Sequence, residues 1–172
     1  MAMKMLEAGG LPVVTDGLRS ADEDNPKGYY EDERVKDLHQ AADKAWLRDA
    51  RGKVVKIISF LLKSLPADNN YQVLLMHRNL REIVASQNKM LVRRGESNAT
   101  SDERAVQLLD EQVRDARFFL RRPQFDVLEL SYGEMLQGAG PQAQRIAEFL
   151  GRPLDVEKMA QVVDVQLYRN RS

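Results

Sequence analysis

The stretch QVLLMHRNLREIVASQNKML, residues 72–91, joins an apolar run to an amphipathic segment and decides the fold class. Its first part, centred on Val73–Met76, is typical of a strand that is covered on both faces. Beyond residue 79 the apolar residues recur at spacings of three and four, which predicts a helix with Glu82 and Ser86 on its outer face. Arg78 stands between the two elements, at the carboxyl end of the predicted strand.

The same alternation of strand and helix patterns extends along the chain. Short runs rich in Val, Ile and Leu predict four strands, at Leu11–Thr15, Lys53–Ser59, Gln72–His77 and Phe125–Leu130. Helical patterns lie between and after them. Strands that alternate with helices form a parallel sheet with right-handed crossovers. We therefore expect one α/β domain over residues 1–172, with helices on both faces of a parallel sheet.

Capping residues define the expected helices. A helix is expected over 31–50, where Val35, Leu38 and Trp46 share one stripe. The others are the quoted helix after Asn79, the longest helix after Ser101, a helix opened by Gly140-Pro141 and closed by Gly151, and a short helix after Asp155.

Composition limits the possible partners. The chain has 172 residues, with 26 basic and 26 acidic residues and a pI of about 6.8, so whole-molecule attraction to nucleic acid or to an anionic membrane is not expected. It has no cysteine and two histidines, which excludes thiolate chemistry and leaves no pattern typical of a metal site. No apolar run is long enough for a bilayer. We expect a cytoplasmic protein without nucleic-acid, membrane or metal partners.

Arg78 and Ser86 are candidates for an anion site. Ligands bind beyond the carboxyl ends of strands in an open parallel sheet, where Arg78 is expected. A guanidinium donates two parallel hydrogen bonds to a phosphate, and the following helix N-terminus favours an anion. Ser86, two turns along, could reach the same phosphate. The alternative is an arginine paired with a nearby carboxylate and a serine that faces water.

Two other stretches could contribute to a site. In DEDNPKGYYE, residues 22–31, Lys27 could neutralise charge on a transferred group and Glu31 could remove a hydroxyl proton. The alternative is an ordinary Asn-Pro-Lys-Gly turn with an acidic helix start. Near the C-terminus, Arg169 and Arg171 could clamp a nucleotide or form a solvated tail. Arg117 lies among acidic residues and is interpreted as solvated surface.

An ordered set of motifs resembles the bacterial sulfotransferase family of the P-loop fold. These motifs are GLPVVTDG, NPKGYYE, GKVVKIIS, VLLMHRNLREIVASQ and VLELSYGEML. The resemblance implies that Arg78 and Ser86 bind the 3′-phosphate of the sulfuryl donor PAPS, or of its product PAP. It also implies that Lys27 and Glu31 line the acceptor side.

The chain departs from the family at its start. The resemblance implies an initial strand and a Gly-rich loop that cradles the phosphosulfate, yet no G-x-x-x-x-G-K-[ST] motif exists here. MAMKMLEAGG resembles the end of the helix that follows that loop. One hypothesis is a PAPS-dependent sulfotransferase, impaired because the loop is missing. The other is a non-catalytic remnant that binds a nucleotide or a protein, expected as a homo-oligomer because a central strand is missing. A P-loop kinase is a weaker third hypothesis.

Overall fold

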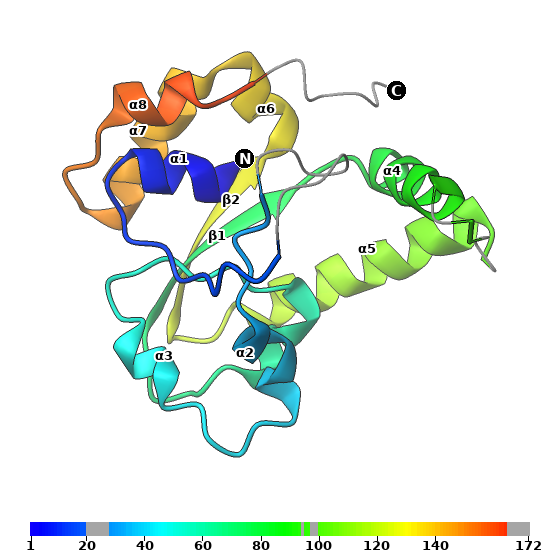
Figure 1. Cartoon of the computed structure of the whole chain (residues 1–172), viewed down its shortest axis with the longest axis horizontal. Helices are drawn as coiled ribbons and strands as arrows, with labels where there is room; N and C mark the ends of the chain where they lie inside the picture. The colour runs from blue at the N-terminus through cyan, green and yellow to red at the C-terminus, as the bar shows by residue number, and fades with distance from the viewer. Residues whose placement is uncertain (20–27, 94, 97–99, 165–172) are drawn as a thin grey trace.

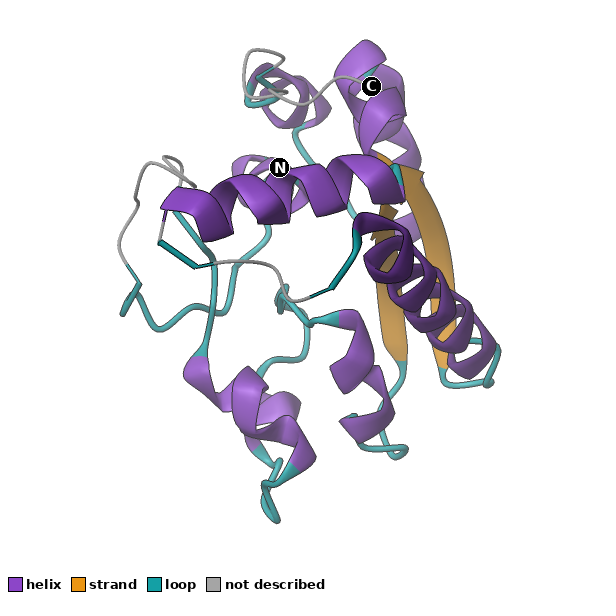
Figure 2. Ribbon diagram, turned by 90° about the vertical axis from the view of Figure 1, so that its right-hand side faces the viewer, coloured by secondary structure: helices purple, strands orange, loops and turns teal. Residues whose placement is uncertain are grey.

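The computed structural model describes residues 1–19, 28–93, 95–96 and 100–164. The fold is mixed α/β, with a two-stranded parallel sheet and helices around it (Figures 1 and 2). Strand β1 (Tyr71–His77) pairs along its whole length with β2 (Phe125–Ser131). These strands confirm the predictions at 72–77 and 125–130.

Four helices cover one face of the sheet, and Figure 1 shows them gathered around its upper end. They are α1 (Ala2–Ala8), α6 (Tyr132–Gln137), α7 (Ala139–Leu150) and α8 (Val156–Gln161). Met5, Leu130, Ile146 and Met159 are fully buried in the apolar cluster between these helices and the strands. Gly9 lets α1 approach α8, because a Cβ there would lie 2.8 Å from the Met159 side chain. The burial of apolar side chains on this face therefore stabilises the contact between α1 and α8, the first and last described helices.

The opposite face is covered by α5 (Asp102–Phe119) and by a 3₁₀ segment, η2 (Ser59–Ser64). Phe119 and Phe125 pack here with Leu62, and the Tyr71 and Phe125 rings stack at 5.3 Å. Below them lie α2 (Glu33–Lys36), η1 (Asp37–His39) and α3 (Trp46–Asp49), whose buried residues join η2 in a third cluster. Helices on both faces of a parallel sheet confirm the predicted class at this coarse level.

Most of the helix boundaries follow the predicted caps. Ser101 accepts from the Arg104 N–H at the start of α5, Gly151 ends α7 with a φ of 63°, and Asp155 caps α8. α4 (Leu80–Arg93) begins after Asn79, whose side chain accepts from the Arg81 N–H. The sequence patterns therefore located these ends to within a residue or two.

The predicted helix over 31–50 is wrong. The chain forms three short pieces there instead of one helix. Asp43 accepts a hydrogen bond of 2.8 Å from the Ala45 N–H, a local turn that competes with helical hydrogen bonding. Lys44 reaches away to the carbonyl oxygen of Ser64 at 2.8 Å. The stripe residues Val35 and Leu38 are buried as expected, although not on one continuous helix.

The predicted strands Leu11–Thr15 and Lys53–Ser59 are also wrong as strands. They meet in one isolated parallel bridge, between Val13 and Val54. Pro12 has no N–H to extend this ladder, and Ser59 already begins η2. The two segments therefore run side by side without forming a continuous ladder.

Candidate functional site

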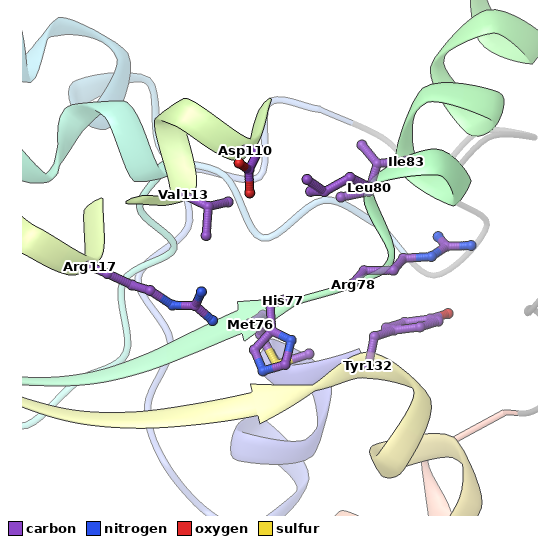
Figure 3. Close-up of a pocket in the computed structure, with 9 residues that line it drawn as sticks. All are labelled: Met76, His77, Arg78, Leu80, Ile83, Asp110, Val113, Arg117 and Tyr132. Atoms are coloured by element: carbon purple, nitrogen blue, oxygen red, sulfur yellow. The ribbon is translucent and has the colours of Figure 1, made fainter. Parts of the chain in front are cut away.

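A pocket of about 350 Å³ opens at the carboxyl end of β1 (Figure 3). It lies between the start of α4, the middle of α5 and the first residue of α6. It is lined by Met76, His77, Arg78, Leu80, Ile83, Asp110, Val113, Arg117 and Tyr132. Its position follows from the parallel sheet, because the chain leaves both strands at this edge and the loops and helix starts gather there. This is the edge at which the sequence predicted a ligand.

Arg78 lines this pocket but is paired with a carboxylate. Its Nε donates to Glu82 Oε2 at 2.8 Å, and the Glu82 side chain is only 7% exposed. Its guanidinium also lies over the Tyr132 ring, 4.8 Å from the ring centroid, and Figure 3 shows the two side chains extending together. The sequence left two alternatives for Arg78, an anion site or a pair with a nearby carboxylate. In the structure Arg78 pairs with the carboxylate of Glu82.

Glu82 is buried, whereas the helical pattern predicted that it faces solvent. It lies four residues after Arg78, and Ser86 lies four residues further, so the three share one side of the chain at helical spacing. The ion pair with Arg78 explains the burial, since a buried carboxylate requires a charged or hydrogen-bonding partner. A pattern based only on apolar periodicity could not have identified this pair.

Ser86 is half-buried on α4, and the residues that line the pocket do not include it. This pocket is therefore not the shared pocket expected for Arg78 and Ser86, and that expectation stays a prediction. Any anion that contacts both residues would also have to lie beside the Glu82 carboxylate.

Glu31 is held by two cations. Its carboxylate accepts from Lys56 Nζ at 3.1 Å and from Arg19 Nη1 at 3.4 Å. Burial raises the pKa of Glu31, but the hydrogen bond and charge of Lys56, together with Arg19, outweigh this and leave the pKa below its ordinary value. A carboxylate that binds a proton this weakly is a poor general base.

The main chain around Glu31 shows what its contacts do for the fold. The Glu31 carbonyl oxygen accepts from Thr15 Oγ1 and from the Asp16 N–H, each at 3.1 Å. Lys56 also donates to the Tyr29 carbonyl oxygen, at 3.2 Å. Glu31 thus connects the segment after residue 28 to the two segments that meet in the bridge between Val13 and Val54. Glu31 does not line the pocket near Arg78.

The remaining candidates, Lys27, Arg169 and Arg171, lie outside the described residues.

Arg117 belongs to the pocket, whereas the sequence pattern predicted that it lies on a solvated surface. Arg117 donates to both carboxylate oxygens of Glu129 on β2, at 3.0 and 2.6 Å, and lines the pocket. The hydrogen bond from Arg117 is the main reason why the pKa of Glu129 lies below its ordinary value. His77 Nε2 lies 3.9 Å from the same carboxylate. The spacing of Asp110, Val113 and Arg117 along α5 was the available signal, since it places all three on one stripe.

The pocket combines apolar walls with charges that are largely compensated. Leu80, Ile83 and Val113 offer an apolar surface, while the two lining arginines each contact a carboxylate. Such a site offers an apolar surface to a flat group and an arginine to an anionic group, while the paired carboxylates weaken its attraction for negative charge. Within the described ranges, no cluster of three or more His, Cys, Asp or Glu side chains could hold a metal ion.

None of the described helices is long and apolar enough to cross a membrane. A comparison of the chain with protein-family models, curated proteins and solved structures found no match.

Proposed function

We propose that this chain is a sulfotransferase-like domain that binds a 3′-phosphorylated adenosine nucleotide, PAPS or PAP, in the pocket at the end of β1. The observation that supports the proposal is the position of Arg78, on the edge of a parallel sheet where ligands bind and in a pocket with apolar walls. The order of the sequence motifs supports it independently. The P-loop fold of the sulfotransferases is part of this proposal.

The surroundings of Arg78 lead us to expect weak binding. The Glu82 bond through Nε orients the guanidinium, and the Tyr132 ring supports it from one face. The same carboxylate places a negative charge beside any phosphate that Arg78 contacts, which opposes anion binding. The apolar side chains Leu80 and Ile83 would contact the adenine or ribose rather than the phosphates.

We propose binding without efficient transfer. Sulfuryl transfer requires preorganised donors at the charge that develops on the phosphosulfate, and losing one such donor typically costs about a hundred- to a thousandfold in rate. The 172-residue sequence has no Gly-rich phosphate loop to supply them. Glu31, the candidate base, has a lowered pKa and two cationic partners. We therefore expect turnover of PAPS near background with hydroxyl or amine acceptors.

Titration calorimetry with adenosine 3′,5′-bisphosphate tests this proposal. Arg78→Ala should weaken binding about ten- to a hundredfold, because a charge-assisted hydrogen bond contributes about 1.5–3 kcal/mol. Arg78→Lys should recover only part of the affinity, since an ammonium cannot make the bidentate contact. The matched control is Arg114→Ala, which removes an arginine that is paired four residues away on the exposed side of α5.

Two results would contradict the proposal. One is no detectable binding of the nucleotide by the wild-type chain at millimolar concentration. The other is equal affinity for the wild-type and Arg78→Ala proteins, once circular dichroism has shown that both are folded.

A second candidate function is a non-catalytic protein-binding unit that forms a homo-oligomer. The observation that favours it is the exposure of two large apolar side chains, Phe60 on η2 at 59% and Phe118 on α5 at 73%, since exposed apolar surface promotes association. Analytical ultracentrifugation across a range of protein concentrations tests it, and a monomer at every concentration would contradict it.

A further inference from the structure

The chain forms two separate parallel pairs. β1 and β2 make the regular ladder, and the segments around Val13 and Val54 make the other pair. In this second pair the Val14 N–H donates to the Val54 oxygen and the Val54 N–H donates to the Pro12 oxygen, both at 2.8 Å. In the described part of the chain, no backbone hydrogen bond joins one pair to the other.

Both pairs nevertheless lie in one layer. Val54 packs in the same apolar cluster as Leu74 and Met76, on the face covered by α1, α7 and α8. Ile57 packs in the opposite cluster, with Val73 and Leu75. Side chains of the segment 53–59 therefore reach the same two faces as the side chains of β1.

The segment 53–59 and β1 also begin at the same end of the molecule. Just before the segment, Arg51 Nη2 donates to Asn69 Oδ1 at 2.7 Å, and Asn69 in turn contacts the Tyr71 hydroxyl at the start of β1. The two elements thus start together and contribute to the same two layers. The arrangement is that of a parallel sheet divided into two halves.

One edge of β1 pairs with β2, and the other edge faces the space between β1 and the segment 53–59, which we call the division. The Tyr71 N–H donates to the Gln124 oxygen at 2.8 Å, so Tyr71, Val73 and Leu75 direct their backbone groups toward β2. Since these directions alternate along a parallel strand, Gln72 and Leu74, like Met76, direct theirs the other way. These three residues have no backbone hydrogen-bond partner among the described residues.

The open edge lies in an apolar setting. Residues Val73 to His77 are all half-buried, so the unpaired groups of Leu74 and Met76 are only partly accessible to water. Unpaired backbone groups that are shielded from water are unfavourable. Ile58, in the segment 53–59, is 48% exposed although the adjacent Ile57 packs against the core. Both features would be resolved if one more strand lay between the two halves.

We infer that β1 accepts a strand from another polypeptide, which pairs in parallel with Gln72, Leu74 and Met76 and completes the sheet. The added backbone would satisfy the open N–H and C=O groups, as in other cases of strand addition. Its side chains would enter both apolar clusters, so the fitting partner is an uncharged extended segment rich in Val and Ile. A charged or proline-containing segment would not fit.

Hydrogen exchange of individual amides, followed by NMR, tests the open edge and the added strand together. In the free protein, the amides of Leu74 and Met76 should exchange much faster than those of Val73 and Leu75, which are bonded to β2. The probe is a synthetic peptide about as long as β1, with alternating Val and Ile and a lysine at each end. It should slow exchange at Leu74 and Met76 by about tenfold or more and leave Val73 and Leu75 unchanged.

Proline variants supply the matched control. Leu74→Pro removes an N–H that faces the open edge, so it should keep the pairing with β2 and abolish peptide binding. Val73→Pro removes an N–H bonded to β2 and should disrupt the ladder itself. Gln72→Pro is the second open-edge variant, at an exposed position, in case Leu74→Pro does not fold. It should weaken peptide binding in a protein whose exchange pattern is otherwise that of the wild type.

A spin label on either end of the peptide tests its direction. In a parallel arrangement, a label on the amino end broadens signals near Asn69, and a label on the carboxyl end broadens signals near Arg78. The reverse pattern would overturn the parallel assignment.

Three further results would overturn the inference. They are slow exchange at Leu74 and Met76 in the free protein at every concentration, unchanged peptide binding after both Leu74→Pro and Gln72→Pro, and no binding of the peptide. Protection of Leu74 and Met76 that rises with protein concentration, without peptide, would show that a second copy is the occupant and would also overturn it.

Discussion

The ion pair between Arg78 and Glu82 should stabilise the fold whether or not a ligand binds. The pair is well shielded, with side chains 24% and 7% exposed and an N–O distance of 2.8 Å. Removing one partner of a buried pair costs about 3–5 kcal/mol, because the remaining charge is left uncompensated. Since Glu82 makes a further interaction, we take a lower value. Arg78→Ala should therefore lower the free energy of unfolding by about 2–3 kcal/mol.

A double-mutant cycle isolates the pair from the effects of truncating each side chain. It comprises Arg78→Ala, Glu82→Ala and the double variant, each unfolded with urea and followed by circular dichroism. The coupling energy should be about 1.5–3 kcal/mol, in the range found for residues that share an ion pair. At this chain length, each kcal/mol corresponds to about 2–4 °C in Tm.

The chain offers a control with the same spacing and opposite exposure. Arg114 and Asp110 also lie four residues apart, with an N–O distance of 3.0 Å, but their side chains are 67% and 52% exposed. Their coupling should be about 0.3–0.5 kcal/mol. A coupling between Arg78 and Glu82 that is no larger than this control value would refute our view that the pair is a shielded part of the fold.

Three other changes give measurable outcomes. Leu130→Ala should lower the free energy of unfolding by about 2–5 kcal/mol in a urea titration, because its side chain is fully buried, whereas Leu18→Ala, at 74% exposure, should change it by less than about 0.5 kcal/mol. Tyr30 donates a hydrogen bond to Glu7, and burial together with this partner raises the pKa of Tyr30 from its ordinary 10.0 to about 12. Its contribution to stability should therefore be complete below pH 10 and lost between pH 10 and about 12. Tyr30→Phe should remove that part of the pH dependence. Ser101→Ala should destabilise the protein by about 1 kcal/mol, since Ser101 caps the longest described helix.

The sequence predicted β1, β2 and the long helices because local patterns decide them. Near-continuous apolar runs and side-chain caps depend on neighbouring residues, and the start of α5 at Ser101 follows from one such cap. The helix expected over 31–50 failed because Asp43 forms a local turn and Lys44 makes a distant contact. The strands expected at Leu11–Thr15 and Lys53–Ser59 failed because Pro12 has no N–H to extend the ladder beyond the bridge at Val13, and because η2 already begins at Ser59.

The candidate site was predictable only in its position. The sequence placed Arg78 at the end of a strand, and the pocket is there. The partner of Arg78 was not predictable from apolar periodicity, because Glu82 occupies what looks like an outer helical position. Arg117 was missed for a related reason. Its carboxylate partner Glu129 lies on a different element, and only the fold brings the two together.

The open edge of β1 and the pocket meet at Met76 and Arg78, which leads to one prediction that involves both. A strand that pairs in parallel with β1 must end at the edge where β1 ends, so residues that follow it would lie beside Arg78. A Val- and Ile-rich peptide extended at its carboxyl end by several glycines would place backbone N–H groups near a nucleotide phosphate there. One new hydrogen bond to a charged group contributes about 1.5–3 kcal/mol, so the affinity for adenosine 3′,5′-bisphosphate should rise about tenfold or more. By linkage, the nucleotide should tighten peptide binding by the same factor, which calorimetry in both orders can measure.

The same glycines at the amino end would lie near Asn69 and should leave nucleotide affinity unchanged. Equal enhancement by both peptides would mean that the strand edge and the pocket are not aligned as the structure indicates.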